Sequence, residues 1–118
     1  MPITKDSVLV EMQKEIPGFQ IDPEWLMDNL TYPAFNDLAR FICSEAEVLQ
    51  LVSSNESPVV AYLAFLERAL RDGDGDVHGM VFECIETLAS CRWINQIKKY
   101  FGPETNALWN RQFSRGEI

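Results

Sequence analysis

The sequence contains few of the residues from which disulfide scaffolds, metal centres and catalytic sites are usually built. Its 118 residues include three cysteines, none of them in a Cys-x-x-Cys pair, and a single histidine. A small, odd number of cysteines argues against a disulfide scaffold, so we expect reduced thiols and a cytoplasmic protein. Glycine-rich phosphate-binding loops are also absent. We therefore expect no cofactor.

Long apolar runs are absent as well. None approaches the ~20 residues that span a bilayer, and the N-terminus lacks a basic region followed by an apolar stretch, so we expect no secretory signal. An apolar fraction of 47% and a mean hydropathy of −0.12 are typical of a soluble globular domain. The length suits one domain that buries a sizeable core.

The charge of the chain is strongly negative and unevenly distributed. The net charge is −8. Residues 1–66 contain ten Asp and Glu against three Lys and Arg, whereas residues 67–118 contain eight acids and seven bases. Such a field repels nucleic acids and anionic membranes and attracts basic proteins. The alternative, that the acidity only keeps the protein in solution, stays open.

Helical periodicity runs through the chain, and no segment alternates like a strand. Apolar residues recur every three or four positions between Pro, Gly and capping side chains. The predicted helices cover residues 5–16, 23–30, 35–42, 57–71, 76–91, 93–101 and 104–113. The third helix either restarts at a capping box over 44–47 or continues to Val52. We predict an all-α fold, a single compact bundle of about six or seven helices over residues 1–118. In this bundle a central antiparallel hairpin packs as in HEAT-like stacks.

One acidic stretch between two of these helices resembles a calcium-binding loop. Its carboxylates occupy positions 1, 3, 5 and 12 of an EF-hand loop: Asp72, Asp74, Asp76 and Glu83. We reject this site because Val77 stands where the loop needs glycine, and Gly79 stands where it needs an apolar residue. A helical turn explains the stretch better, with Gly73 or Gly75 at positive φ. Asp74 or Asp76 then caps the second helix.

The remaining reactive side chains do not assemble a site. His78 has no metal ligand or nucleophile beside it on its helix, so we interpret it as a surface or packing residue. Cys43, Cys84 and Cys91 fall on or beside apolar helix faces, which is typical of small buried hydrophobic residues. We therefore predict no catalytic residue and no metal site.

A short helix in the acidic half is the best candidate for a protein interface. Trp25 stands there near Glu24 and Asp28, and an aromatic side chain rimmed by charge suits the centre of an interface. Glu67 either pairs with Arg71 one helical turn later or lies at a groove between helices. The predicted partner-binding residues are acidic or aromatic: Glu24, Trp25, Asp28, Asp37, Glu45 and Glu67.

Four short motifs mark the second half of the chain. They are Phe65-Leu66-Glu67, the Gly73-Asp74 turn, Ile85-Glu86-Thr87-Leu88 and the closing segment "YFGPETNALWNRQ" at 100–112. With these motifs, residues 57–113 resemble a family of small acidic, all-helical bacterial proteins of uncharacterised function. Members of that family resemble immunity proteins encoded beside polymorphic or contact-dependent toxins.

The resemblance implies a function by occlusion. An acidic helical surface would dock on a basic toxin domain, such as a nuclease, and block its active site. Our first hypothesis is thus a non-enzymatic cytoplasmic immunity protein that binds neither nucleic acid nor membrane. The alternative is a helical protein–protein interaction module without a toxin partner, homodimeric or not. An enzyme or metal sensor comes third because no site is assembled, and the oligomeric state stays open.

Overall fold

Seven α-helices and one short 3₁₀ helix make up most of the chain that the structure describes. This structure is a computed structural model and describes residues 2–51 and 58–113. Within these residues the all-α prediction is confirmed, because the only β-type contact is an isolated bridge. The elements are α1 (Val8–Glu15), α2 (Pro23–Met27), α3 (Thr31–Leu51), α4 (Pro58–Asp72), α5 (Gly75–Ala89), α6 (Ile94–Ile97), the 3₁₀ helix η1 (Lys98–Tyr100) and α7 (Pro103–Gln112).

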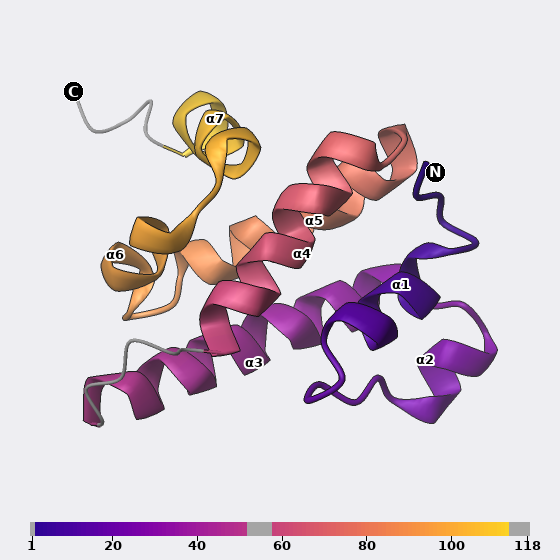
Figure 1. Cartoon of the computed structure of the whole chain (residues 1–118), viewed down its shortest axis with the longest axis horizontal. Coiled ribbons are helices and arrows are strands. Elements are labelled where there is room, and N and C mark those ends of the chain that lie inside the picture. Colours follow the sequence, from indigo (N-terminus) through magenta and orange to yellow (C-terminus); the bar gives the residue numbers. More distant parts are fainter. Residues whose placement is uncertain (1, 52–57, 114–118) are drawn as a thin grey trace.

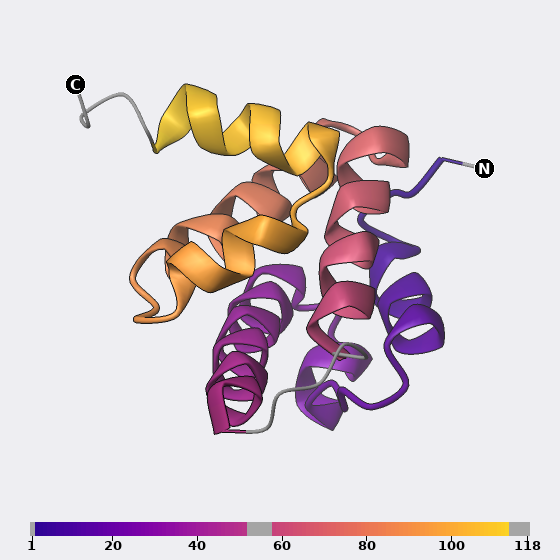
Figure 2. The same cartoon turned by 60° about the vertical axis from the view of Figure 1, so that its left-hand side comes forward.

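The long helix α3 runs along one side of the molecule, and α4 and α5 pack on it (Figure 1). α4 and α5 form the predicted hairpin, but α5 packs more extensively on α3 than on α4. Figure 2 shows α4 standing between α1 on one side and α6 and η1 on the other. α4 therefore connects the N-terminal helices with the C-terminal ones.

A continuous hydrophobic core joins these elements. Apolar residues at helical spacing supply it, as the sequence pattern predicts. Its largest fully buried side chains come from the N-terminal segment, from α1 and its C-terminal end, and from α3, α4, α5 and α6: Ile3, Met12, Ile16, Phe35, Leu38, Ile42, Leu63, Phe65, Leu66, Ile85, Leu88 and Ile97. Among the helices that the structure describes, none is long and apolar enough to cross a membrane.

α3 is one continuous helix that begins earlier than predicted. It starts at Thr31, because Pro33 falls in the first turn, where its missing N–H needs no partner. The chain continues through the capping box over 44–47 without a new start, and Ala46 is buried in the core. Of the two alternatives, continuation is confirmed up to Leu51, and Val52 lies outside the described residues.

The turn between α4 and α5 is shorter than predicted and is built differently. Among the described residues no glycine has positive φ, so the prediction for Gly73 or Gly75 is wrong. Gly73 is instead required by space, because an added Cβ would collide with the carbonyl of Ala69 and the side chain of Val77. Asp74 caps α5, as predicted: its Oδ1 accepts the N–H of Val77 at 3.0 Å.

The N-terminal segment closes this turn from outside. The N–H of Ile3 donates to the carbonyl of Asp72 at 2.9 Å, and the carbonyl of Ile3 accepts from the N–H of Asp74 at 3.1 Å. The side chain of Ile3 is buried. Residues far apart in sequence thus satisfy the backbone groups that the two helix ends leave open.

The acidic stretch of this turn has no loop in which a calcium ion could sit. α5 is helical from Gly75 onward, whereas a calcium loop starting at Asp72 would stay open for several more residues. Asp74 is used as a cap, and the hydrogen bond from Arg71 to Asp72 lowers the pKa of that carboxyl. Within residues 2–51 and 58–113, no group of three or more His, Cys, Asp or Glu could hold a metal ion.

Candidate protein-binding surface

Four of the seven large apolar residues that are exposed in the described part of the chain lie in and just after α2, between positions 26 and 32. α2 contributes no buried residue, and the side chain of Met27 is 83% exposed. Contiguous apolar surface of this kind marks interaction sites in soluble proteins. We call the following set the α2 surface: Glu24, Leu26, Met27, Asp28, Leu30 and Tyr32.

The sequence fixes both ends of α2 with identifiable bonds. At the start, Asp22 Oδ1 accepts the N–H of Glu24 at 2.9 Å, and Pro23 occupies the first helical position. At the end, Asn29 adopts the left-handed conformation with φ 52°, and the N–H of Leu30 donates to the carbonyl of Trp25 at 2.8 Å. This is a Schellman motif, which terminates a helix sharply and satisfies its last carbonyls.

Two further contacts hold α2 on the molecule. The Asn29 side-chain amide donates to the carbonyl of Lys5 at 3.0 Å, which ties the end of α2 to the N-terminal segment. Trp25 is partly buried and packs against the core. Because the helix is anchored by Trp25 and Asn29, Leu26 and Met27 are presented to solvent on a fixed backbone, which lowers the entropy lost on binding.

The sequence prediction placed Trp25 at the centre of an interface, and this stays a prediction; in the structure Trp25 is partly buried. Trp25 is the anchor of α2, while the exposed apolar side chains are Leu26, Met27 and Leu30. Sequence reasoning missed these three residues because their spacing reads as an ordinary amphipathic helix. One signal was available in the sequence: Trp25, Leu26 and Met27 are consecutive, and successive residues of a helix point in different directions, so the three cannot all face the core.

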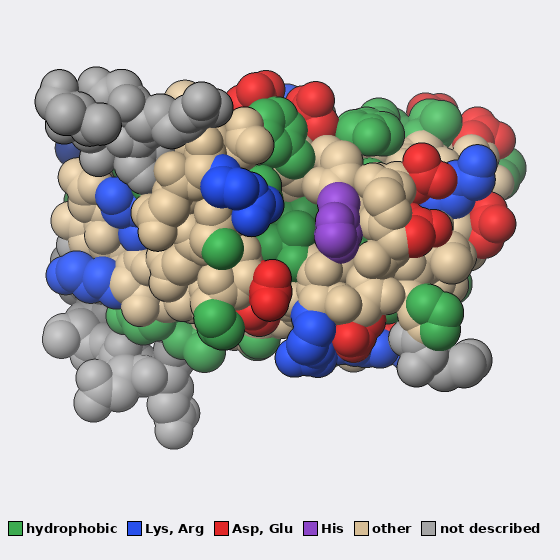
Figure 3. Space-filling view, turned by 90° about the horizontal axis from the view of Figure 1, so that it is seen from above, with side chains coloured by type: hydrophobic (Ala, Val, Ile, Leu, Met, Phe, Trp, Pro, Cys, Tyr) green, Lys and Arg blue, Asp and Glu red, His purple; other side chains and the backbone are tan. Residues whose placement is uncertain are grey.

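Acidic side chains flank this apolar surface. Glu24 and Asp28 are exposed and have no ion pair among the described residues. On the face that Figure 3 shows, charges of opposite sign gather at opposite ends. Asp and Glu predominate toward the end with the α4–α5 turn, and Lys and Arg toward the end with α6 and α7. The acidic end of this face includes the α4–α5 turn, while α2 lies on the opposite face, toward the bottom of Figure 1.

The other predicted partner-binding residues do not join the α2 surface. Asp37 lies on α3 and pairs with Arg40 at 2.6 Å. Glu45, also on α3, contributes with burial to a raised pKa of Tyr62, burial being the larger cause. The structure thus brings together Glu24, Trp25 and Asp28 and leaves Asp37, Glu45 and Glu67 on other helices.

Glu67, a partly buried residue of α4, caps the start of α7. Its carboxylate accepts the N–H of Glu104 at 2.8 Å, the N–H of Thr105 at 2.9 Å and the Thr105 hydroxyl at 2.9 Å. The helix needs an external cap because its N-cap residue is Gly102, which has no side chain. Neither sequence reading of Glu67 included this role, and the ion pairs of Arg68 and Arg71 go to other acids.

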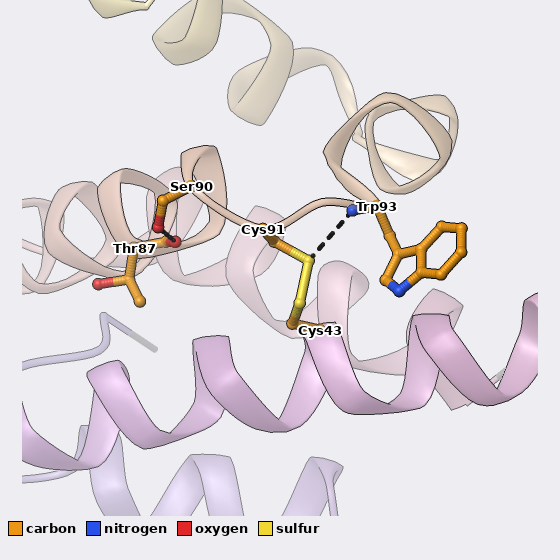
Figure 4. The surroundings of a disulfide bond; sticks show 5 residues. All are labelled: Cys43, Thr87, Ser90, Cys91 and Trp93. Carbon is orange, nitrogen blue, oxygen red and sulfur yellow. Dashed lines mark hydrogen bonds between the residues drawn. A yellow bond between two sulfur atoms is a disulfide. The ribbon is translucent and has the colours of Figure 1, made fainter.

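The cysteines are arranged differently from the prediction of three reduced thiols. Cys43 and Cys91 form a disulfide, and Figure 4 shows it crossing from α3 to the connection between α5 and α6. Cys84 is a free, fully buried thiol whose pKa is raised by burial, so it stays protonated and unreactive. The cysteine count could not reveal the pair, because residues 48 positions apart meet only in the fold.

His78 has a structural contact. Its Nε2 donates to the carbonyl of Leu70 at 2.7 Å, which joins the start of α5 to the last turn of α4. Among the described residues, no hydrogen bond joins His78 to Cys84 or to the disulfide. The α2 surface is therefore the clearest candidate for a functional site, and its exposed side chains suit binding.

A family model described as "Domain of unknown function (DUF7674)" matches residues 9–115. No curated protein and no solved structure matches the chain.

Proposed function

The chain belongs to this family of domains of unknown function, and we propose that it is a non-enzymatic immunity protein that neutralises a basic toxin domain by occlusion. The observation that carries the proposal is the α2 surface, an exposed apolar segment flanked by Glu24 and Asp28 in the acidic half of the chain. The family resemblance supplies the toxin as the class of partner.

Apolar and acidic side chains have separate tasks in this mechanism. Leu26, Met27 and Leu30 bury apolar area on the partner and set the lifetime of the complex. Glu24 and Asp28 pair with Lys or Arg around the toxin site and accelerate the encounter. A toxin that acts on a polyanion carries such a basic site, and a protein seated on it prevents the substrate from entering.

The compartment of this encounter is a separate part of the proposal. A cytoplasmic location rested on the expectation of reduced thiols, whereas a disulfide persists best in an oxidising compartment. We therefore favour neutralisation in an oxidising compartment over the cytoplasm.

The proposal requires a toxin gene beside the gene of this protein, and sequencing the neighbouring reading frames tests this first; its absence would count against a toxin partner. On the toxin domain found there, charge and apolar contact can be tested separately. We expect Met27→Ala to raise the dissociation rate about tenfold or more, as for an interface anchor. The double variant Glu24→Lys/Asp28→Lys should slow association by about tenfold at low salt, with a smaller effect at high salt. Both rates come from surface plasmon resonance, and survival of cells expressing the toxin reports neutralisation.

Matched controls come from other exposed positions. Val60→Ala removes an apolar side chain that is 44% exposed on α4, and Glu86→Lys reverses an exposed charge on α5. Both should leave the two rates unchanged, with circular dichroism confirming the fold of every variant. Unaltered rates in the Met27 and Glu24/Asp28 variants would disprove the role of the α2 surface. Self-association that depends on Met27, seen by light scattering without toxin, would instead support a homodimeric interaction module.

A further inference from the structure

The Cys43–Cys91 disulfide joins two parts of the chain that are distant in sequence. Cys43 lies in α3, and Cys91 lies between the end of α5 and the start of α6 (Figure 4). Their Cα atoms are 6.1 Å apart, within the range that a disulfide spans. The bond therefore crosslinks α3 to the point at which the chain enters its last helices.

Local hydrogen bonds hold Cys91 in place without help from the crosslink. Its N–H donates to the carbonyl of Leu88 at 2.9 Å, and its carbonyl accepts from the N–H of Ile94 at 3.1 Å. The N–H of Trp93 donates to Cys91 Sγ at 3.4 Å. Since the turn presents the sulfur toward α3 by itself, the thiol form keeps the geometry needed to close the bond again.

The crosslink acts beside a short helix with few anchors of its own. α7 is held by the Glu67 cap and by buried Thr105, Leu108 and Trp109. In α6, Ile97 is the one buried side chain, and Trp93 and Ile94 at its start are only partly buried. The disulfide therefore adds a covalent link to a helix that otherwise docks mainly through Ile97, whereas α7 has its own cap and three buried side chains.

We propose that Cys43 and Cys91 are a reversible thiol–disulfide pair whose oxidised form fixes α6 and η1 on α3. Cys43 is the less buried of the two cysteines, so in this proposal a small thiolate attacks the disulfide at Cys43 Sγ. The S–S bond breaks, Cys91 leaves as a thiolate and takes a proton, and Cys43 is left in a mixed disulfide. A second small thiol releases Cys43, so two thiols are oxidised to one small disulfide while the protein gains two thiols. Cys84 takes no part, because it is fully buried.

The experiment compares the full chain after equilibration in oxidised or reduced glutathione. Alkylation in denaturant followed by peptide mass spectrometry should find a Cys43–Cys91 crosslink and one free thiol, Cys84, in the oxidised sample. In the reduced sample all three cysteines should be alkylated in denaturant. Reduction should also lower the thermal unfolding midpoint by about 10 °C. Hydrogen exchange should then rise at residues 92–100 more than in α1 or α4.

Two variants distinguish this pair from a general effect of reductant. Cys84→Ser should keep the redox-dependent shift in midpoint, whereas Cys43→Ser/Cys91→Ser should lose it and unfold near the midpoint of the reduced wild type. Three alkylated cysteines in the oxidised sample would overturn the proposal, as would an equal rise in exchange throughout the molecule on reduction. The test needs no toxin, so its result is independent of the proposed function.

Discussion

At the scale of single residues, the contact between Glu67 and the start of α7 is the internal polar interaction with the clearest energetic consequence. One carboxylate satisfies three donors and places negative charge at a helix N-terminus. We expect Glu67→Ala to lower the free energy of unfolding by about 2 kcal/mol, measured by urea denaturation. Glu86→Ala, on the exposed face of α5, is the matched control and should change it by less than about 0.5 kcal/mol.

Gly102 allows a sharper version of the same test. A Cβ built at Gly102 would stand 2.5 Å from Cδ of Glu67, so Gly102→Ala should displace the carboxylate from its donors. Once Glu67 is already Ala, the added methyl has space, and Gly102→Ala should then destabilise the protein less. If the losses of unfolding free energy from the two substitutions simply add, positions 67 and 102 act independently. That result would contradict the contact between them in the structure.

At the scale of secondary-structure elements, helix starts and stops were the part of the fold most open to prediction. Pro23 and Pro103 mark helix starts correctly because proline fits the first helical position, and Asp74 caps α5 because its oxygen reaches the open N–H groups. These signals act over three or four residues, so the sequence alone contains them. The start of α3 at Thr31 was missed because the prediction began at the first large apolar residue of its core-facing side, Phe35.

Features made by residues far apart in sequence could not be predicted in the same way. The Glu67 cap of α7, the Ile3 contact with the α4–α5 turn and the Cys43–Cys91 bond each need the fold to bring the partners together. The candidate surface was found in part: Glu24 and Asp28 mark its acidic rim, but the exposure of Met27 depends on which side of α2 Trp25 anchors.

A second contact between elements, centred on Arg68, joins α1 to α4. Arg68 bonds to Glu15 and, at 3.1 Å, to Glu11, and these carboxylates raise the pKa of its guanidinium. We expect Arg68→Gln to lower the free energy of unfolding by about 1 kcal/mol at low salt, because the groups are partly exposed and screened. The loss arises from the ion pairs and from the repulsion left between the two glutamates.

Salt and a surface pair provide the controls for Arg68. The effect of Arg68→Gln should shrink in 1 M NaCl, where the Debye length is about 3 Å. Arg40→Gln removes the more exposed pair with Asp37 and should change stability by no more than about 0.5 kcal/mol. An Arg68 effect no larger than the Arg40 effect would contradict a role for Arg68 in holding α1.

At the scale of the whole molecule, the two ends differ in charge and in how they are linked to the core. On the face shown in Figure 3, acidic side chains predominate at the end with the α4–α5 turn and basic ones at the end with α6 and α7. The Cys43–Cys91 disulfide links α3 to the connection before α6. α4 lies between the ends and contributes Phe65 and Leu66 to the core that both share. The proposed partner surface and the disulfide are therefore both connected to one common core.

Because that core is continuous, we expect the oxidised protein to unfold in one cooperative step. Trp25 reports on the N-terminal end and Trp109 on α7, so single-tryptophan variants can follow each end separately. Trp93→Phe/Trp109→Phe and Trp25→Phe/Trp93→Phe should each show coincident urea midpoints by fluorescence and by far-UV circular dichroism.

In the reduced protein the fluorescence and circular dichroism midpoints should still agree for the Trp109 reporter, because Glu67 and not the disulfide holds α7. A Trp109 transition that precedes the loss of helix in the oxidised protein would show that the C-terminal helices form a separate unit, contrary to one shared core.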